Sequence, residues 1–316
     1  MKKTNYIVVD TIAFESIKVG ARLPFSIYVN DNNEYVLFLK PDVLIEKEVL
    51  DNLWIKDKRE LFINIQDKEA YQAYLSSNLG GLIRDQSIPQ KAKCKMIYSS
   101  TSNLMDELLQ KPDSPESILK AKELVSESLE HVLTDASAIK SMITMSAYDY
   151  YTYSHSVNVS IYSLGLGRHL GMNKEQLNLL GSSALLHDLG KSKVAPELIN
   201  KRGRLTEDEF EIVKGHPSLG YELLKKYGEK SFQILGGARH HHEKFDGTGY
   251  PKGLKGEDIP LFGRIILIAD VFDALSTKRS YKEAMPTFEA LKLMKNQMAG
   301  HFDPKLFASF IKFMQQ

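Results

Sequence analysis

Histidine is concentrated in one part of this sequence. The chain has nine histidines, and seven of them fall between His155 and His242. A hydrophobic core has no packing reason to collect imidazoles. Neutral imidazole together with carboxylate, in contrast, forms a mixed nitrogen and oxygen ligand set for iron, manganese or zinc. The pattern therefore indicates a metal-binding site.

The pair His187-Asp188 is one element of this pattern. It follows the apolar run Ala184–Leu186 and precedes Gly190, a residue suited to a helix C-terminus, so we expect the pair in a last helical turn beside buried leucines. A buried carboxylate is costly unless it is paired or bound to a cation. Taken alone, the pair is more simply interpreted as a helix end whose histidine caps a carbonyl group.

Further histidines and an aspartate favour a metal site over a simple helix cap. His155 opens a predicted helix, His216 follows an amphipathic segment, the run 240–243 reads His-His-His-Glu, and Asp270 ends the apolar run Ile265–Ala269. Each has a plain structural alternative, such as a cap, a surface imidazole, a chance run or a core salt bridge. One shared metal site explains all of them with fewer coincidences.

Composition limits the partners and the compartment. Hydrophobic residues make up 43% and charged residues 26% of the 316 positions, and the formal net charge is +1. This balance argues against a binder of DNA or RNA polymers or of membrane surfaces, so an anionic ligand must be held by a local site. A single cysteine, Cys94, fits a reducing compartment. With no run near the ~20 apolar residues of a membrane span, we expect a cytoplasmic protein without membrane insertion.

The elements that position these residues fall into two parts. Residues 1–98 are expected to form a smaller mixed α/β domain, with short strands at Tyr6–Val9, Ser26–Val29 and Glu34–Leu39. Residues 99–115, rich in serine, threonine and proline, are expected to connect the domains. Residues 116–316 show helical spacing of apolar residues almost throughout, which predicts an all-α helical bundle as the catalytic domain.

Three strings of this helical part resemble the HD-GYP family, a branch of the HD phosphohydrolases that hydrolyses cyclic di-GMP. They are 184–191 (ALLHDLGK), 241–251 (HHEKFDGTGYP) and 268–275 (IADVFDAL), and His301–Pro304 also resembles the family. The resemblance runs from about Ser114 to the C-terminus. The His-Asp pair alone is unspecific, whereas the long second string in this order and spacing is highly specific.

The resemblance implies a centre of two divalent metal ions, with iron or manganese expected. Some family members have a glutamate four residues before the first histidine, which supports a third metal, and this chain has Tyr151 there. We therefore expect two ions. The implied ligands are His155, His187, Asp188, His216, His241, His242 and Asp270.

The resemblance also implies catalytic and substrate-contacting residues. Asp188 and Lys191 are the expected catalytic residues, although a cation at a helix C-terminus is an equally plain interpretation of Lys191. Asp273 is expected to orient neighbouring groups, such as Arg279, rather than to bind metal. The expected substrate-binding residues are Lys191, Gly249, Tyr250, Arg279 and Lys282.

The function implied is a metal-dependent phosphodiesterase of bacterial signalling that opens cyclic di-GMP to linear pGpG. Whether hydrolysis continues to GMP stays open. One alternative is a phosphodiesterase for another cyclic dinucleotide, such as cyclic GMP-AMP. Another is a receptor or scaffold that binds the nucleotide without turnover, although all seven implied ligands are present. The N-terminal domain is expected to be regulatory, with a possible role in binding a protein partner.

Overall fold

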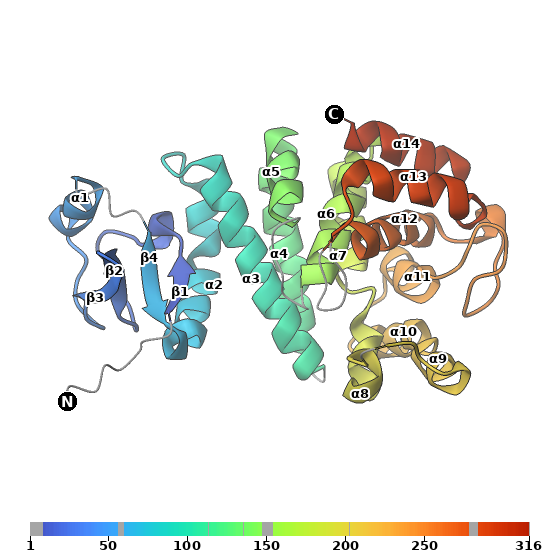
Figure 1. Cartoon of the computed structure of the whole chain (residues 1–316), viewed down its shortest axis with the longest axis horizontal. Helices are drawn as coiled ribbons and strands as arrows, with labels where there is room; N and C mark the ends of the chain where they lie inside the picture. Colours follow the sequence, from blue (N-terminus) through green and yellow to red (C-terminus); the bar gives the residue numbers. More distant parts are fainter. Residues whose placement is uncertain are drawn as a thin grey trace. The chain divides into compact units, whose positions relative to one another are not determined.

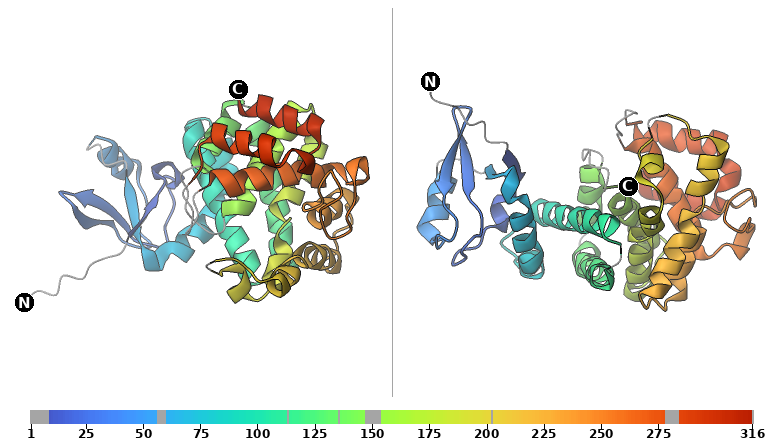
Figure 2. Two further views of the ribbon diagram at one scale, coloured as in Figure 1. Left: turned by 45° about the vertical axis from the view of Figure 1, so that its right-hand side comes forward. Right: turned by 90° about the horizontal axis from the view of Figure 1, so that it is seen from below.

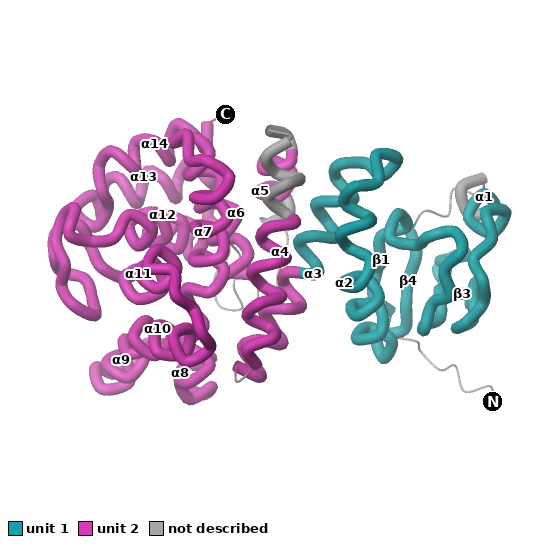
Figure 3. The backbone as a smooth tube through the Cα atoms, turned by 180° about the vertical axis from the view of Figure 1, so that it is seen from behind, with its two compact units in different colours: residues 1–100 teal, residues 101–316 magenta. Residues whose placement is uncertain are grey.

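The computed structural model describes residues 9–55, 60–112, 114–134, 136–146, 154–201, 203–277 and 284–315. The chain divides into two compact units, Met1–Ser100 and Thr101–Gln316 (Figure 3). The first contains all the strands described and the second is helical, which confirms the predicted fold class. Among the described residues, no helix combines the length and apolar character needed to cross a bilayer.

The first unit contains a four-stranded antiparallel sheet with the strand order β1-β4-β2-β3. Its strands are β1 (Val9–Ile12), β2 (Ile27–Asp31), β3 (Glu34–Leu39) and β4 (Leu61–Asn64). Asn32 and Asn33 join β2 to β3 with φ angles of 50° and 66°. This left-handed conformation is the one that a two-residue hairpin turn requires and that asparagine tolerates.

Three helices accompany the sheet: α1 (Lys47–Ile55), α2 (Lys68–Arg84) and α3 (Gln90–Gln110). The segment 99–115, predicted to connect two domains, is helical up to Gln110, because these residues continue α3. Apolar residues of the same helix are buried, among them Ile97, Met105 and Leu108 at 0 to 1% exposure. Their burial outweighs the modest helix propensity of the Ser-Ser-Thr-Ser run.

The second unit is a helical bundle without strands among its described residues. Its α-helices are α4 (Pro115–Thr134), α5 (Ala136–Ser146), α6 (Ser154–His169), α7 (Lys174–Leu185), α8 (Pro196–Ile199), α9 (Glu207–Val213), α10 (His216–Lys226), α11 (Phe232–His240), α12 (Leu261–Ser276), α13 (Thr287–Gln297) and α14 (Pro304–Met314). A 3-10 helix, Leu189–Lys193, follows α7.

Helices α6 and α7 form the centre of this bundle. They lie between α4 and α5 on one side and α12 and α14 on the other (Figure 1, Figure 2). Nearly every residue of α6 is buried, as expected for a helix packed on all faces. The apolar core includes Val159, Leu166, Leu180, Ile265, Phe272 and Phe310. Side chains carried by α6, α7 and α12 are therefore held by the most tightly packed part of the unit.

Several helices of the second unit begin with a side-chain cap. Asn173 and Thr206 each form a reciprocal capping box, with Gln176 and Glu209 respectively. Asp303 accepts hydrogen bonds from the backbone amides of Lys305 and Leu306 at the start of α14. These caps satisfy amide groups that a helix leaves without partners.

Candidate metal centre

Three buried imidazoles are each held by a hydrogen bond from Nδ1 to a main-chain carbonyl group. In each, Nδ1 lies 2.6 to 2.8 Å from the carbonyl oxygen of the residue three positions earlier. A carbonyl oxygen can only accept, so Nδ1 carries the hydrogen and Nε2 presents a lone pair in the neutral ring. The pairs are His187 with Ala184, His216 with Val213, and His241 with Ala238.

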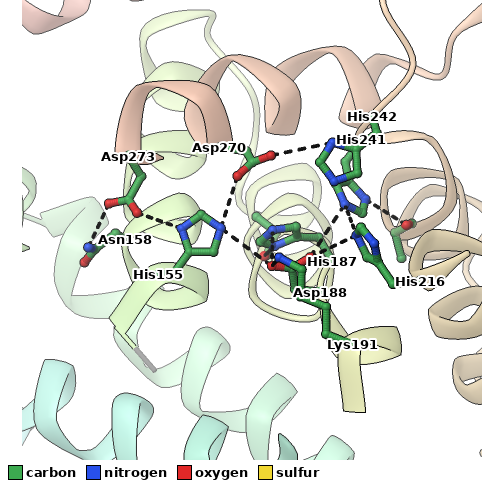
Figure 4. A network of polar contacts seen from close by, with 12 residues as sticks. His155, Asn158, His187, Asp188, Lys191, His216, His241, His242, Asp270 and Asp273 are labelled. Carbon is green, nitrogen blue, oxygen red and sulfur yellow. Dashed lines mark hydrogen bonds and ion pairs between the residues drawn. The ribbon is translucent and has the colours of Figure 1, made fainter. Parts of the chain in front are cut away.

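The Nε2 atoms of these rings converge on Asp188 (Figure 4). They lie 3.4 Å (His187), 3.2 Å (His216) and 3.8 Å (His241) from an oxygen of that carboxylate. The Nε2 atoms of His216 and His241 are themselves 3.2 Å apart. Two lone pairs at this distance repel each other, and a cation between them would turn the repulsion into coordination.

Two atoms of the cluster are buried without a hydrogen bond among the described residues. They are His187 Nε2 and Asp188 Oδ1, although His216 Nε2 lies 3.2 Å from the latter. A buried acceptor without a partner costs ~1–3 kcal/mol, and a metal ion would satisfy both atoms at once. The donor set, imidazole nitrogen and carboxylate oxygen, suits iron, manganese or zinc. The residues present therefore fit a metal site.

His155, at the start of α6, stands on the opposite side of the cluster. Its Nε2 lies 3.1 Å from Asp270 Oδ1 and 3.6 Å from Asp188 Oδ2. Its Nδ1 donates to Asp273 Oδ2 at 2.7 Å. A carboxylate behind a ligating histidine fixes the ring and makes the facing nitrogen a stronger ligand.

Asp273 orients a neighbouring group, His155, whereas Arg279, its predicted partner, lies outside the described residues. The Asp273 side chain is buried at 1% exposure, and its Oδ1 also accepts from Asn158 Nδ2 at 2.8 Å and Thr277 Oγ1 at 2.7 Å. Asn158 and Thr277 were not predicted. The sequence signal was their spacing, since Asn158 follows His155 by three residues and Thr277 follows Asp273 by four, which places each pair on one helix face.

All seven implied ligands are brought together. Ligand atoms of Asp188, His216, His241 and His242 lie within 4.8 Å of one another, as do those of a second group, His155, His187 and Asp188. Asp188 belongs to both groups. Asp270 lies beside both, 3.1 Å from His155 Nε2 and 3.8 Å from His242 Nδ1.

The charges of the cluster favour ligand forms of the side chains. Burial raises the pKa of Asp188, but the Lys191 ammonium and nearby imidazoles outweigh it and hold this pKa well below its usual range. Burial lowers the pKa of His241 and takes that of His242 to about 3, so both rings stay neutral. His155 differs. Burial opposes its protonation, yet hydrogen bonds to Asp270 and Asp273 raise its pKa to about 9.

The His187-Asp188 pair lies beyond the end of α7 at Leu185 rather than in the last helical turn. Gly190 does not act as a left-handed cap. A Cβ atom at Gly190 would lie 1.9 Å from the His216 carbonyl oxygen and 2.5 Å from the Gly220 amide nitrogen. Glycine is required here because this backbone touches α10. The contact brings Asp188 and His216 into one cluster.

Lys191 reaches the same centre from the 3-10 helix. Its Nζ lies 2.5 Å from Asp188 Oδ2, and its side chain remains 31% exposed. The ammonium group therefore sits between the carboxylate and solvent, where an incoming anion would meet it.

The loop after α11 is fixed by a buried glutamate that sequence reasoning did not single out. Glu243, with 0% exposure, accepts the amides of Lys252 at 2.7 Å and Leu254 at 3.0 Å. A Cβ atom at Gly249 would lie 2.2 Å from the Lys244 nitrogen, so only glycine fits. A carboxylate directly after three histidines and before a glycine-rich turn was the available signal.

Tyr250 lies next to the metal cluster. Its amide donates to the His242 carbonyl at 3.1 Å, and the two side-chain rings pack 4.8 Å apart with planes 31° from parallel. Burial, with the charges of Asp270 and Asp188, raises the pKa of the Tyr250 hydroxyl, which therefore stays protonated.

Three residues used in the sequence predictions lie outside the described residues: Tyr151, Arg279 and Lys282.

Comparisons with known proteins agree with this picture. A family model described as HD domain matches residues 121–306. A cyclic di-GMP phosphodiesterase of Pseudomonas aeruginosa is 38% identical over 192 residues, 61% of this chain and 46% of that protein. A 3'3'-cGAMP-specific phosphodiesterase of Vibrio cholerae is 40% identical over 163 residues, 51% of this chain and 35% of that protein. The chain thus spans less than half the length of either relative.

One solved structure resembles almost the whole chain. An HDGYP protein from Bdellovibrio bacteriovorus matches with a TM-score of 0.69, covering 98% of this chain and 100% of that one, at 22% identity. A likeness at this identity shows the fold. Together, the family match and the relatives agree with the resemblance drawn from the sequence: the chain belongs to the HD domain family.

Proposed function

We propose that this chain is a metal-dependent phosphodiesterase that hydrolyses cyclic di-GMP to linear pGpG. The observation that carries the proposal is the convergence of five imidazoles and two carboxylates on one centre, where buried ligand atoms of His187 and Asp188 have no hydrogen bond among the described residues. The relatives include a protein named as a cyclic di-GMP phosphodiesterase, which supports the substrate class.

The centre is proposed to hold two divalent ions, iron or manganese. Asp188 would help to hold both ions, since it belongs to both groups of ligand atoms. His155, His187 and Asp270 would complete one side, and His216, His241 and His242 the other. When bound, two such ions lower the pKa of a water and stabilise the attacking and leaving oxygens of a phosphodiester.

The chain's own residues then bind and orient the substrate. Lys191 is proposed to contact the scissile phosphate, because its ammonium lies at the exposed side of Asp188. It is also proposed to protonate the ribose 3′-oxygen, whose bond to phosphorus breaks as the oxygen of a hydroxide bonds to phosphorus from the opposite side. Gly249 and Tyr250 are proposed to bind the nucleotide, and Arg279 and Lys282 stay predicted phosphate contacts.

A second substrate has a specific observation in its favour. The relative of Vibrio cholerae is named for 3'3'-cGAMP and is 40% identical over 163 residues. A competitive assay with both dinucleotides in one reaction separates the two proposals by the ratio of their kcat/KM values. For residues 1–98, a regulatory or protein-binding role stays a prediction.

The test is turnover by purified, metal-loaded protein. Protein loaded separately with iron, manganese or zinc is incubated with cyclic di-GMP, products are separated by chromatography, and bound metal is measured by elemental analysis. We expect pGpG to form at a rate that follows metal content. Tight binding of cyclic di-GMP without pGpG would instead support a receptor or scaffold.

A further inference from the structure

Helix α9 exposes a large aromatic side chain beside the metal centre. No residue of α9 is buried, and Phe210 and Ile212 are 47% and 55% exposed. Phe210 approaches Tyr250 edge-on, with ring centroids 6.5 Å apart and planes at 82°. Since Tyr250 packs on His242, the two aromatic rings extend outward from the cluster.

A lysine lies over this aromatic pair. Lys214 Nζ is 5.6 Å from the centroid of the Phe210 ring and 5.6 Å from that of Tyr250. It pairs with Glu211 at 2.6 Å, but Glu211 is solvent-facing, with its side chain 67% exposed. Surface pairs of this kind are worth little, so the ammonium can exchange Glu211 for a phosphate.

The position of α9 is well defined. Its capping box, formed by Thr206 and Glu209, closes the N-terminus, and Glu209 also pairs with Lys201 at 2.7 and 2.5 Å. Phe210 and Lys214 are four residues apart and therefore lie on one helical face. The aromatic ring and the charge are thus presented together rather than by a free loop.

A cyclic dinucleotide carries two phosphates and two bases, and the metal centre with Lys191 accounts for one phosphate. We propose that Phe210 and Lys214, together with Tyr250, form the part of the site that holds the second nucleotide. Lys214 pairs with the phosphate that is not cleaved, and Phe210 contacts a base, since aromatic faces stack on any base. This inference rests on the proposed function.

The test compares a substrate with two phosphates to one with a single phosphate. Lys214→Met, Lys214→Arg and Phe210→Leu are measured for the Kd of cyclic di-GMP, and for kcat/KM on cyclic di-GMP and on bis(p-nitrophenyl) phosphate. Lys226→Met is the matched control, because Lys226 also lies over a tyrosine ring, 5.2 Å from Tyr227, at the far end of α10.

We expect Lys214→Met to weaken cyclic di-GMP binding by about tenfold, the loss expected for one charge-assisted contact. Its kcat/KM for cyclic di-GMP should fall by a similar factor relative to that for the small diester. Lys214→Arg should restore most of the binding, Phe210→Leu should weaken it, and Lys226→Met should match the wild type.

Failure of the inference and failure of the proposed function give different results. If Lys214→Met binds and cleaves cyclic di-GMP like the wild type, the inference is overturned and the function stands. If Lys214→Met weakens binding of cyclic di-GMP but the wild type forms no pGpG, the inference stands and the proposed function fails. Equal losses on both substrates, or no binding of cyclic di-GMP by the wild type, also overturn the inference.

Discussion

The imidazoles of the metal cluster are held in two different ways. His187, His216 and His241 donate from Nδ1 to main-chain carbonyl groups, whereas His155 donates to the carboxylate of Asp273. A main-chain anchor is set by the path of the backbone and cannot be removed by substitution. A carboxylate anchor adds charge behind the ring and strengthens the ligand. The difference teaches that His155 can be tuned through a neighbouring side chain, whereas the three rings anchored to the main chain change only when a ligand itself is replaced.

Substitution of Asp188, which belongs to both groups of ligand atoms, should reduce activity the most. Asp188→Asn removes the charge that both groups of ligand atoms share, so we expect activity on cyclic di-GMP to fall by more than the roughly 10–100-fold typical of outer-shell partners. Metal content, measured by elemental analysis, should fall with it. Asp258→Asn, at an exposed position, is the control. Retained turnover in Asp188→Asn would remove this residue from the proposed centre.

Replacing a ligand that is anchored to the main chain should rank next. His187→Ala removes a ring with 0% exposure whose Nε2 has no hydrogen bond among the described residues, so one ligand position is lost. We expect a loss of activity on the order of 10²-fold or more, as for other directly participating groups. Thermal unfolding measured alongside separates this effect from the cavity left by the imidazole. Full metal content with normal activity would contradict the assignment.

The carboxylate that anchors His155 can be changed while every predicted ligand stays in place. Asp273→Asn keeps the shape but introduces an NH₂ group among three donors, His155, Asn158 and Thr277. We expect metal affinity or activity to drop by about 10–100-fold. In a Mn²⁺ titration the loss should fall mainly on one binding step. If every Mn²⁺-binding step weakened equally, the two groups of ligand atoms would not bind metal independently.

The smallest effect is expected at the substrate loop. Gly249→Ala would place a Cβ atom 2.2 Å from the Lys244 nitrogen, which forces the loop away from His242. We expect KM for cyclic di-GMP to rise by roughly tenfold, a change of about 1.4 kcal/mol, while metal content stays unchanged. Gly236→Ala, whose Cβ would make an ordinary 3.4 Å contact with Pro260, is the matched control. A loss of metal in Gly249→Ala would show that the loop also supports the centre.

Sequence periodicity was sufficient for the helical unit, because a buried helix face is a local pattern. It was weaker around residues 99–110, where burial of Ile97, Met105 and Leu108 keeps α3 continuous through a run that is typical of a connection. The clustered residues were identified through the resemblance of their strings to a known family, because residue type and spacing left a plain alternative for each. The distances and hydrogen bonds between these residues could not be predicted from the sequence.

The sequence by itself determined the fold class, the family and the set of side chains that meet at the centre. Only the tertiary structure decided that His187-Asp188 lies past the end of α7, that Gly190 admits the backbone of α10, and that Asp273 serves His155. It also revealed Phe210 and Lys214 beside Tyr250. The reason is physical. Residue type and spacing fix which groups share a helix face, whereas contacts between segments far apart in the chain depend on how the helices pack.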